Sequence, residues 1–194
     1  MAGTRPRSTT PEGREQRARI LRVALELFTA HGFRGASLDA VAAEVGISRQ
    51  GVLHYFPSKT KLLLGVLELR DEESIARAQE LQDAEFVTAL LDLVTHNQRE
   101  PDLTRLFTVL AAESVAPEHP GHEHFLQRYR RVREGLAEGV RQAQAAGQLR
   151  TDVDARNLAI LLAAVMDGLQ LQFLLDPESV EMVEPFAALL DLLV

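Results

Sequence analysis

The stretch that decides the fold runs from Ser37 to Lys59 and reads SLDAVAAEVGISRQGVLHYFPSK. Ser37 is a favoured helix N-cap, and apolar residues follow it at helical spacing, which predicts a short helix. Gly46 can adopt the left-handed conformation that ends this helix, and Ser48 can cap a second one. Pro57 disfavours helical geometry in the residue before it, so the second helix ends there. The pattern is that of a helix-turn-helix, whose second helix lies in the DNA major groove.

The second helix carries polar residues on the face opposite its apolar residues Val52 and Phe56. Glutamine can pair with adenine and arginine with guanine, whereas tyrosine and lysine hold the phosphate backbone. Taken alone, the same pattern also fits an ordinary surface helix of an α-helical bundle. The residues predicted to contact DNA are Ser37, Ser48, Arg49, Gln50, Gly51, Leu53, His54, Tyr55 and Lys59.

The net charge of −7 is unevenly distributed along the chain. Residues 1–61 contain ten basic and five acidic side chains, whereas residues 62–194 contain eleven basic and 23 acidic side chains. This asymmetry indicates a nucleic-acid-binding end on an otherwise acidic body.

Helical periodicity continues through the rest of the chain, without an alternating strand pattern or an internal repeat. A first helix is predicted from about Arg14 to His31, where Gly32 ends it. The helix capped by Ser58 continues toward Gln82, and its apolar residues on several sides indicate that it belongs to both halves of the protein. Further helices are predicted at 84–97, 102–115, 123–146, 155–175 and 180–193. The predicted fold class is all-α.

The run SRQGVLHYFPSKTKLL, residues 48–63, resembles the recognition-helix signature of tetracycline-repressor (TetR) family transcriptional regulators. The surrounding residues, from about 14 to 64, agree with it. One difference is Leu53, where the family commonly has tyrosine, and this favours an apolar contact such as one to a thymine methyl group. The resemblance implies an all-helical remainder with an effector pocket and a dimer interface.

These observations divide the chain into three segments. Residues 1–13, rich in Pro, Thr, Gly and Arg, form a disordered arm whose Arg5 and Arg7 either reach DNA or only solubilise the chain. Residues 14–61 form the three-helix, helix-turn-helix DNA-binding domain. Residues 62–194 form a helical domain for effector binding and dimerisation.

Apolar residues of the middle helices line an effector cavity or simply fill the core. A few polar residues among them would give a ligand its orientation. The candidate effector-binding residues are Val66, Leu93, Asn97, Phe107, Leu110, Phe125, Arg128, Tyr129 and Met166.

The segment 158–175 and the last helix are too apolar on all sides for the surface of a monomer. A two-fold partner that buries both helices in a four-helix bundle would resolve this, and a large monomer core is the alternative. The predicted interface consists of Leu158, Leu161, Leu162, Val165, Leu169, Phe173, Phe186, Leu189, Leu190 and Leu193.

The sequence disfavours enzymatic and membrane roles. It has no cysteine, which excludes thiolate catalysis and Cys-based zinc sites, and it has no uninterrupted membrane-spanning run or signal peptide. A helical metal-binding protein or enzyme that uses the His119–His124 cluster is the main alternative, but the spacing favours an exposed loop. A helical adaptor that binds protein through its last helices is another alternative. We predict no catalytic residue, metal or cofactor, and a cytoplasmic location.

The expected function is that of a homodimeric transcriptional regulator, a repressor that releases a palindromic operator when a small apolar or amphipathic effector binds. Its partners would be double-stranded operator DNA, the effector and a second copy of the chain. Activation of transcription, and an effector that promotes DNA binding, are alternatives that the sequence leaves open.

Overall fold

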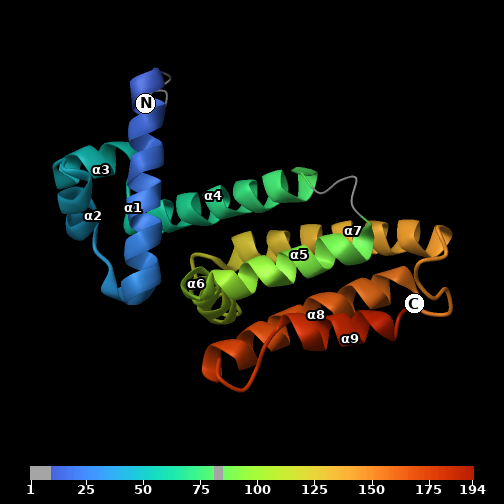
Figure 1. Ribbon diagram of the computed structural model, residues 1–194. Helices are drawn as coiled ribbons and strands as arrows, with labels where there is room; N and C mark the ends of the chain where they lie inside the picture. The colour runs from blue at the N-terminus through green and yellow to red at the C-terminus, as the bar shows by residue number, and fades with distance from the viewer. Residues whose placement is uncertain (1–9, 81–84) are drawn as a thin grey trace. The chain divides into compact units, whose positions relative to one another are not determined.

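The computed structural model describes residues 10–80 and 85–194, and all regular elements in these ranges are α-helices (Figure 1). The predicted all-α fold class is therefore confirmed. The chain divides into two compact units, Met1–Ser74 and Ile75–Val194, and the division falls within helix α4 (Lys59–Glu80). Residues 1–9 of the predicted arm, and the helix ends predicted at residues 82 and 84, lie outside the described residues.

Helix α1 (Pro11–Gly35) begins three residues earlier than the sequence predicts. The reason is a cap that starts at Thr10, whose hydroxyl accepts a 3.2 Å hydrogen bond from the amide of Gly13, followed by proline at a position that favours helix starts. Gly32 interrupts the regular helix with φ 68° and ψ 167°, and one further turn follows. The regular helix therefore stops at Gly32 as predicted, and residues 33–35 add a short turn after this kink.

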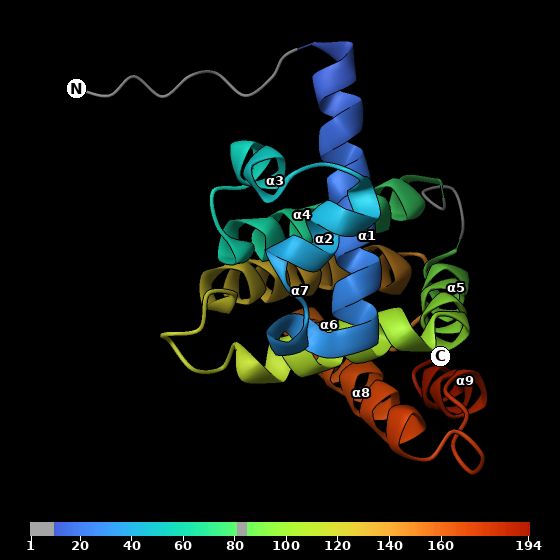
Figure 2. The same cartoon turned by 90° about the vertical axis from the view of Figure 1, so that its left-hand side faces the viewer.

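Two short helices, α2 (Leu38–Val45) and α3 (Arg49–Tyr55), form the helix-turn-helix, and α2 packs against both α1 and α3 (Figures 1 and 2). The hydroxyl of Ser37 accepts from the amide of Ala40, and that of Ser48 accepts from the amide of Gly51, both at 3.0 Å. Gly46 ends α2 in the left-handed conformation, with φ 76°. The fully buried side chains of this unit include Ile20, Phe28, Val41, Val45, Val52, Leu62 and Leu63.

Helix α4 starts close against the rest of the N-terminal unit. The hydroxyl of Ser58 accepts a 3.1 Å hydrogen bond from the amide of Lys61, which caps the helix as predicted. A methyl group added at Gly65 would lie 2.9 Å from both Leu21 and Phe56, so only glycine fits at this crossing. This contact fixes the start of α4 against α1 and against the end of α3.

The C-terminal unit contains α5 (Phe86–Arg99), α6 (Pro101–Glu113), α7 (His122–Ala145), α8 (Ala155–Leu175) and α9 (Val183–Asp191). Among the described helices, α7 and α8 make the most extensive contact. A side chain at Gly139 of α7 would overlap the ring of Phe86, so this glycine lets α5 and α7 approach closely. The core cluster joins α5, α7, α8 and α9 through residues that include Leu90, Val94, Val140, Leu158, Leu162, Met166, Phe186 and Leu190.

Polar contacts hold α9 at both ends. At its start, the amide of Met182 donates a 2.7 Å hydrogen bond to the side-chain oxygen of Gln98 in α5. This contact helps to explain why α9 begins at residue 183 and not at the predicted residue 180. At its end, the amide of Arg150 donates a 2.7 Å hydrogen bond to the carbonyl of Leu193.

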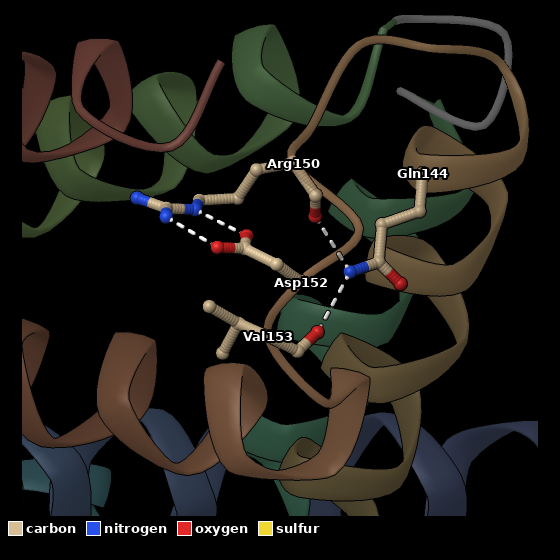
Figure 3. A network of polar contacts seen from close by, with 4 residues as sticks. All are labelled: Gln144, Arg150, Asp152 and Val153. Atoms are coloured by element: carbon tan, nitrogen blue, oxygen red, sulfur yellow. Dashed lines mark hydrogen bonds and ion pairs between the residues drawn. The ribbon is translucent and has the colours of Figure 1, made fainter.

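The loop that carries Arg150 is itself ordered by a small polar network (Figure 3). The side-chain amide of Gln144 donates to the carbonyls of Arg150 and Val153, at 2.8 and 3.0 Å. The guanidinium of Arg150 donates two 2.6 Å hydrogen bonds to Asp152, which lower the pKa of this exposed carboxyl. The corner between α7 and α8 therefore gives the end of α9 a defined anchor.

Candidate DNA-binding and ligand-binding sites

The start of α3 presents a group of exposed polar side chains. Ser48, Arg49 and Gln50 occupy its cap and first turn, and all three are exposed, as is His54 further along the helix. The single fully buried residue of α3 is Val52, which attaches the helix to the core. The helix is thus held by one apolar side chain, and its polar face is open to a partner.

The remaining predicted DNA contacts lie around this group. Ser37 is exposed, whereas Gly51, Leu53, Tyr55 and Lys59 are half-buried. The rings of His54 and Tyr55 meet edge to face, with centroids 5.2 Å apart. A side chain at Gly51 would press on Ile47, with a closest approach of 3.3 Å, so this glycine allows the tight turn between the helices.

Two contacts at this site were not anticipated from the sequence. Arg49 lies 3.5 Å from the carboxylate of Asp39 in α2, and both side chains are about 60 % exposed or more. Such an exposed ion pair contributes little to stability, so Arg49 can exchange Asp39 for an anionic partner at small cost. The spacing of Asp39 and Arg49 across the turn is the sequence signal that could have revealed this pair.

Lys59 also has a structural contact. Its ammonium donates a 3.2 Å hydrogen bond to the carbonyl of Arg34 and lies 4.6 Å from the centre of the Phe33 ring. The side chain therefore ties the start of α4 to the last turn of α1. An ammonium has three donors, so the remaining N–H groups can still meet a phosphate.

The predicted effector residues lie in several environments. Leu110, Phe125, Met166 and, in the N-terminal unit, Val66 are buried. The half-buried ones are Leu93, Asn97, Phe107, Arg128 and Tyr129. The carbonyl of Asn97 accepts a 2.8 Å hydrogen bond from Thr104, so this residue helps to shape the corner between α5 and α6.

One polar pair stands out among the candidate effector residues. The hydroxyl of Tyr129 in α7 donates a 2.8 Å hydrogen bond to Asp167 in α8. Burial, followed by the nearby charge of Asp167, raises the pKa of Tyr129, so the phenol stays protonated. Burial also raises the pKa of Asp167, although the Tyr129 hydrogen bond and the charge of Arg128 act in the opposite direction.

A hollow of about 330 Å³ opens between α7 and α8. It contains none of the predicted effector residues, and sequence reasoning did not identify it. Positions 130, 133, 134, 137 and 141 are spaced so that they share one face of α7. This spacing is the sequence pattern that could have predicted the α7 side of the hollow. The residues that line it are Arg130, Arg133, Glu134, Ala137, Arg141, Arg156 and Ile160.

The predicted dimer interface needs a correction. Leu158, Leu162, Phe186 and Leu190 are at most 2 % exposed, because they fill the core of their own chain. They are therefore not available to a partner. Leu161 is exposed, and Val165, Leu169, Phe173, Leu189 and Leu193 are half-buried.

Helix α8 nevertheless keeps an exposed apolar face. Ile160, Leu161, Leu171 and Leu175 are each about half exposed or more. By length and composition α8 is apolar enough to cross a bilayer, and only 28 % of its most apolar stretch is buried. Six of its side chains belong to the core, so α8 is a core helix with one uncovered apolar side.

The histidine cluster forms a closed loop rather than an open site. The amide of Gly121 donates a 3.1 Å hydrogen bond to Nδ1 of His119, and the hydroxyl of Ser114 lies 2.9 Å from the same nitrogen. Nδ1 of His122 lies 2.8 Å from the carbonyl of Ser114. Within residues 10–80 and 85–194, no three His, Asp or Glu side chains are arranged to hold a metal ion. The Nδ1 atoms of His119 and His122 therefore support the turn.

Comparisons with known proteins place this geometry in a family. A model described as "Bacterial regulatory proteins, tetR family" matches residues 20–66, and one described as "BetI-type transcriptional repressor, C-terminal" matches residues 83–193. The regulator UidR of Escherichia coli K12 is 27 % identical over 160 residues, which are 81 % of each chain. The repressor AcnR of Corynebacterium diphtheriae is 25 % identical over 153 residues, 79 % of this chain and 78 % of AcnR.

A solved structure agrees with these relatives. A transcriptional regulator from Saccharomonospora viridis in complex with choline superposes with a TM-score of 0.78 at 26 % identity, covering 92 % of this chain and 94 % of that one. The two family models together match most of the chain, in the order expected for an N-terminal DNA-binding part and a C-terminal regulatory part. The chain therefore belongs to the TetR family of transcriptional regulators, which are DNA-binding transcription factors and not enzymes.

Proposed function

We propose that the chain is a cytoplasmic, homodimeric repressor that leaves a palindromic operator when a small effector binds its C-terminal unit. In this proposal residues 14–61 bind DNA, and residues 62–194 bind the effector and form the dimer. The observation that carries it is the capped helix α3, whose first turn presents Arg49 and Gln50 to solvent. A helix held in this way offers donors to base edges in the major groove.

Operator binding can be tested with DNA from upstream of the protein's own gene in a mobility-shift assay. We expect the wild-type protein to shift this DNA, and the Arg49→Ala/Gln50→Ala variant to lose the preference over random DNA. Arg99→Ala, an exposed arginine of the C-terminal unit, is the matched control. An unchanged preference in the double variant would argue against base readout by α3.

The dimer in this proposal is formed through the exposed face of α8. Ile160, Leu161, Leu171 and Leu175 line one side of the helix, and Ala164 and Gly168 lie between them, where small residues allow close approach. A face of this kind is a normal protein–protein contact. Two copies related by a two-fold axis would bury it on both chains.

The effector in this proposal is small and amphipathic, with a cationic group as the favoured polar end. The support is the pair of Tyr129 and Asp167, an aromatic ring and a carboxylate that suit a positively charged head group. Choline, a small cation, is bound by the Saccharomonospora viridis relative. An effector acts on DNA binding only if it prefers one conformation of the protein, and the coupling must be reciprocal.

Calorimetry with choline as the probe tests this part of the proposal. We expect saturable binding to the wild-type protein, weaker binding to Asp167→Asn, and lower affinity when operator DNA is present. Equal affinity with and without operator would contradict allosteric control by this ligand. Binding that is unchanged in Asp167→Asn would place the cation elsewhere.

A further inference from the structure

The hollow between α7 and α8 collects positive charge around an apolar floor. Arg130, Arg133 and Arg156 stand around it, and Ala137 and Ile160 form the apolar part of its lining. The backbone amide of Arg156 caps α8 through a 3.1 Å hydrogen bond to Asp154, but the guanidinium groups of these three arginines have no hydrogen bond or ion pair with another described residue. Glu134 is the acidic residue of this lining, and the fourth arginine, Arg141, pairs with Glu138. An excess of positive charge is unusual on a body that is acidic overall, so the hollow is electrostatically incomplete within a single chain.

The opposite charge lies on the last helix. From residue 157 to residue 194 the chain has six acidic residues and no lysine, arginine or histidine. On α9, Glu184 and Asp191 are exposed and lie on one face with Ala188 between them, and the neighbouring Leu192 is 72 % exposed. Neither carboxylate has a hydrogen bond or ion pair within the described residues. This face of α9 is therefore complementary to the hollow: both have apolar residues at the centre, and the charges around them have opposite signs.

Within one chain, α9 cannot bring these carboxylates to the hollow. Its start is tied to α5 by the 2.7 Å hydrogen bond between Met182 and Gln98. Its end is tied to the corner after α7 by the 2.7 Å hydrogen bond between Arg150 and Leu193 (Figure 3 shows the network that orders this corner). The buried side chain of Phe186 holds the helix between these two points. The acidic face is consequently directed away from its own core and is available to another molecule.

We propose that the arginine hollow receives the exposed acidic face of α9 from a second copy of the chain. The inference rests on the proposed homodimer and names the contact that sets its geometry. Ile160 supports it, because this residue belongs both to the hollow and to the exposed apolar face of α8. The hollow is thus continuous with the surface that would form the dimer.

The two kinds of contact have different roles. Exposed ion pairs add little affinity by themselves, whereas the apolar face of α8 supplies most of the buried area. Charge complementarity instead selects one orientation and penalises others, because like charges that face each other are costly. In a two-fold dimer the contact occurs twice, so the arginines specify how two copies dock.

A charge-swap experiment tests this contact by sedimentation at low salt. Variant A is Arg133→Glu/Arg156→Glu, and variant B is Glu184→Arg/Asp191→Arg. We expect each variant alone to dimerise at least tenfold more weakly than the wild type, because like charges then face each other. An equimolar mixture of A and B should form a heterodimer with near wild-type affinity, since both contacts regain opposite charges. Arg99→Glu/Arg105→Glu is the control for variant A, with the same change in net charge.

Several outcomes would overturn the inference. Wild-type dimerisation of both variants would do so, as would a mixture that shows no preference for the heterodimer. Saturable binding of citrate to the wild-type dimer that is lost in variant A would show that the hollow stays open to free anions. Leu161→Glu separates this inference from the proposed function. If that variant still dimerises, the α8 interface itself is wrong; if it is monomeric while A and B dimerise normally, only the arginine contact is wrong.

Discussion

Helices α3 and α8 both leave one side uncovered, but the two sides differ in chemistry. α3 has seven residues, of which Val52 is buried, and it exposes Arg49, Gln50 and His54. α8 has 21 residues, six of them buried, and it exposes apolar side chains that include Leu161. A polar exposed side suits a hydrated, charged partner, whereas an apolar one suits protein. The uncovered side of each helix thus indicates what binds there.

The two helices also differ in what holds them. α3 is a seven-residue helix that depends on its cap, Ser48, and on one buried side chain, Val52. A helix this short has little stability of its own. α8 is anchored along its length by the core cluster of the C-terminal unit. Substitutions on the exposed face of α3 should therefore change DNA recognition with little effect on folding. In α8, substitutions of buried residues should lower folding stability, whereas substitutions of adjacent exposed residues should weaken the proposed dimer.

The sharpest test of this contrast compares two adjacent leucines of α8. Leu162 is 1 % exposed and Leu161 is 56 % exposed. We expect Leu162→Ala to lower the free energy of unfolding by about 2–5 kcal/mol, because it leaves a cavity in the core. Leu161→Ala should cost less than about 1 kcal/mol of folding stability but weaken the dimer. Urea denaturation measures the loss of folding stability, and sedimentation at several protein concentrations measures dimer affinity. An equal loss of folding stability in the two variants would contradict the assignment of Leu162 to the core and Leu161 to the interface.

The proposed recognition role of α3 predicts a smaller effect at Gln50. We expect Gln50→Ala to cost about 1–3 kcal/mol on the operator and little on random DNA, since a base-edge contact is lost. Fluorescence anisotropy with both duplexes at a fixed salt concentration measures the difference. Equal losses on both would mean that Gln50 holds the DNA backbone instead.

The caps of the helix-turn-helix should have a still smaller effect. Ser48→Ala removes the 3.0 Å hydrogen bond to the amide of Gly51 and should lower stability by about 1 kcal/mol. Ser48→Asp restores an acceptor and is the matched control. Thermal unfolding followed by circular dichroism distinguishes them; the same midpoint for wild type and Ser48→Ala would mean that this cap is dispensable.

Sequence patterns were sufficient where local chemistry determines structure. Ser37, Gly46 and Ser48 encode caps and a turn within a few residues, and these appear in the structure as predicted. Periodicity also gave the helices of the C-terminal unit to within a few residues.

Patterns were insufficient where structure depends on residues far apart in the chain. Nearly every side of α8 carries apolar residues, so helical periodicity alone did not distinguish the buried Leu158 from the exposed Leu161. The hydrogen bond that Lys59 donates within the protein depends on the carbonyl of Arg34, 25 positions earlier in the chain. The start of α9 depends on the side chain of Gln98, 84 positions earlier. Such contacts are consequences of the packed fold and leave no local signal.

The smallest expected effect concerns Asp167, a carboxylate on the otherwise apolar α8. Burial raises its pKa, so the folded state retains this proton to a higher pH than the unfolded state. The stabilising contribution of the protonated form is present below the usual aspartate pKa and is lost as the pH rises through the raised value. Asp167→Asn cannot ionise, yet it keeps an acceptor for the hydroxyl of Tyr129. We expect this variant to gain a few tenths of a kcal/mol to about 1 kcal/mol at pH 7, since partial exposure screens the charge, and little at pH 3.5. Urea denaturation at both pH values measures the gain.

Tyr129→Phe is the companion variant, because without the phenol the ionised carboxylate is held less well and the gain from Asp167→Asn at pH 7 should increase. A gain that is the same at both pH values would show that the ionisation of Asp167 does not affect folding, and that α8 tolerates this charge without cost.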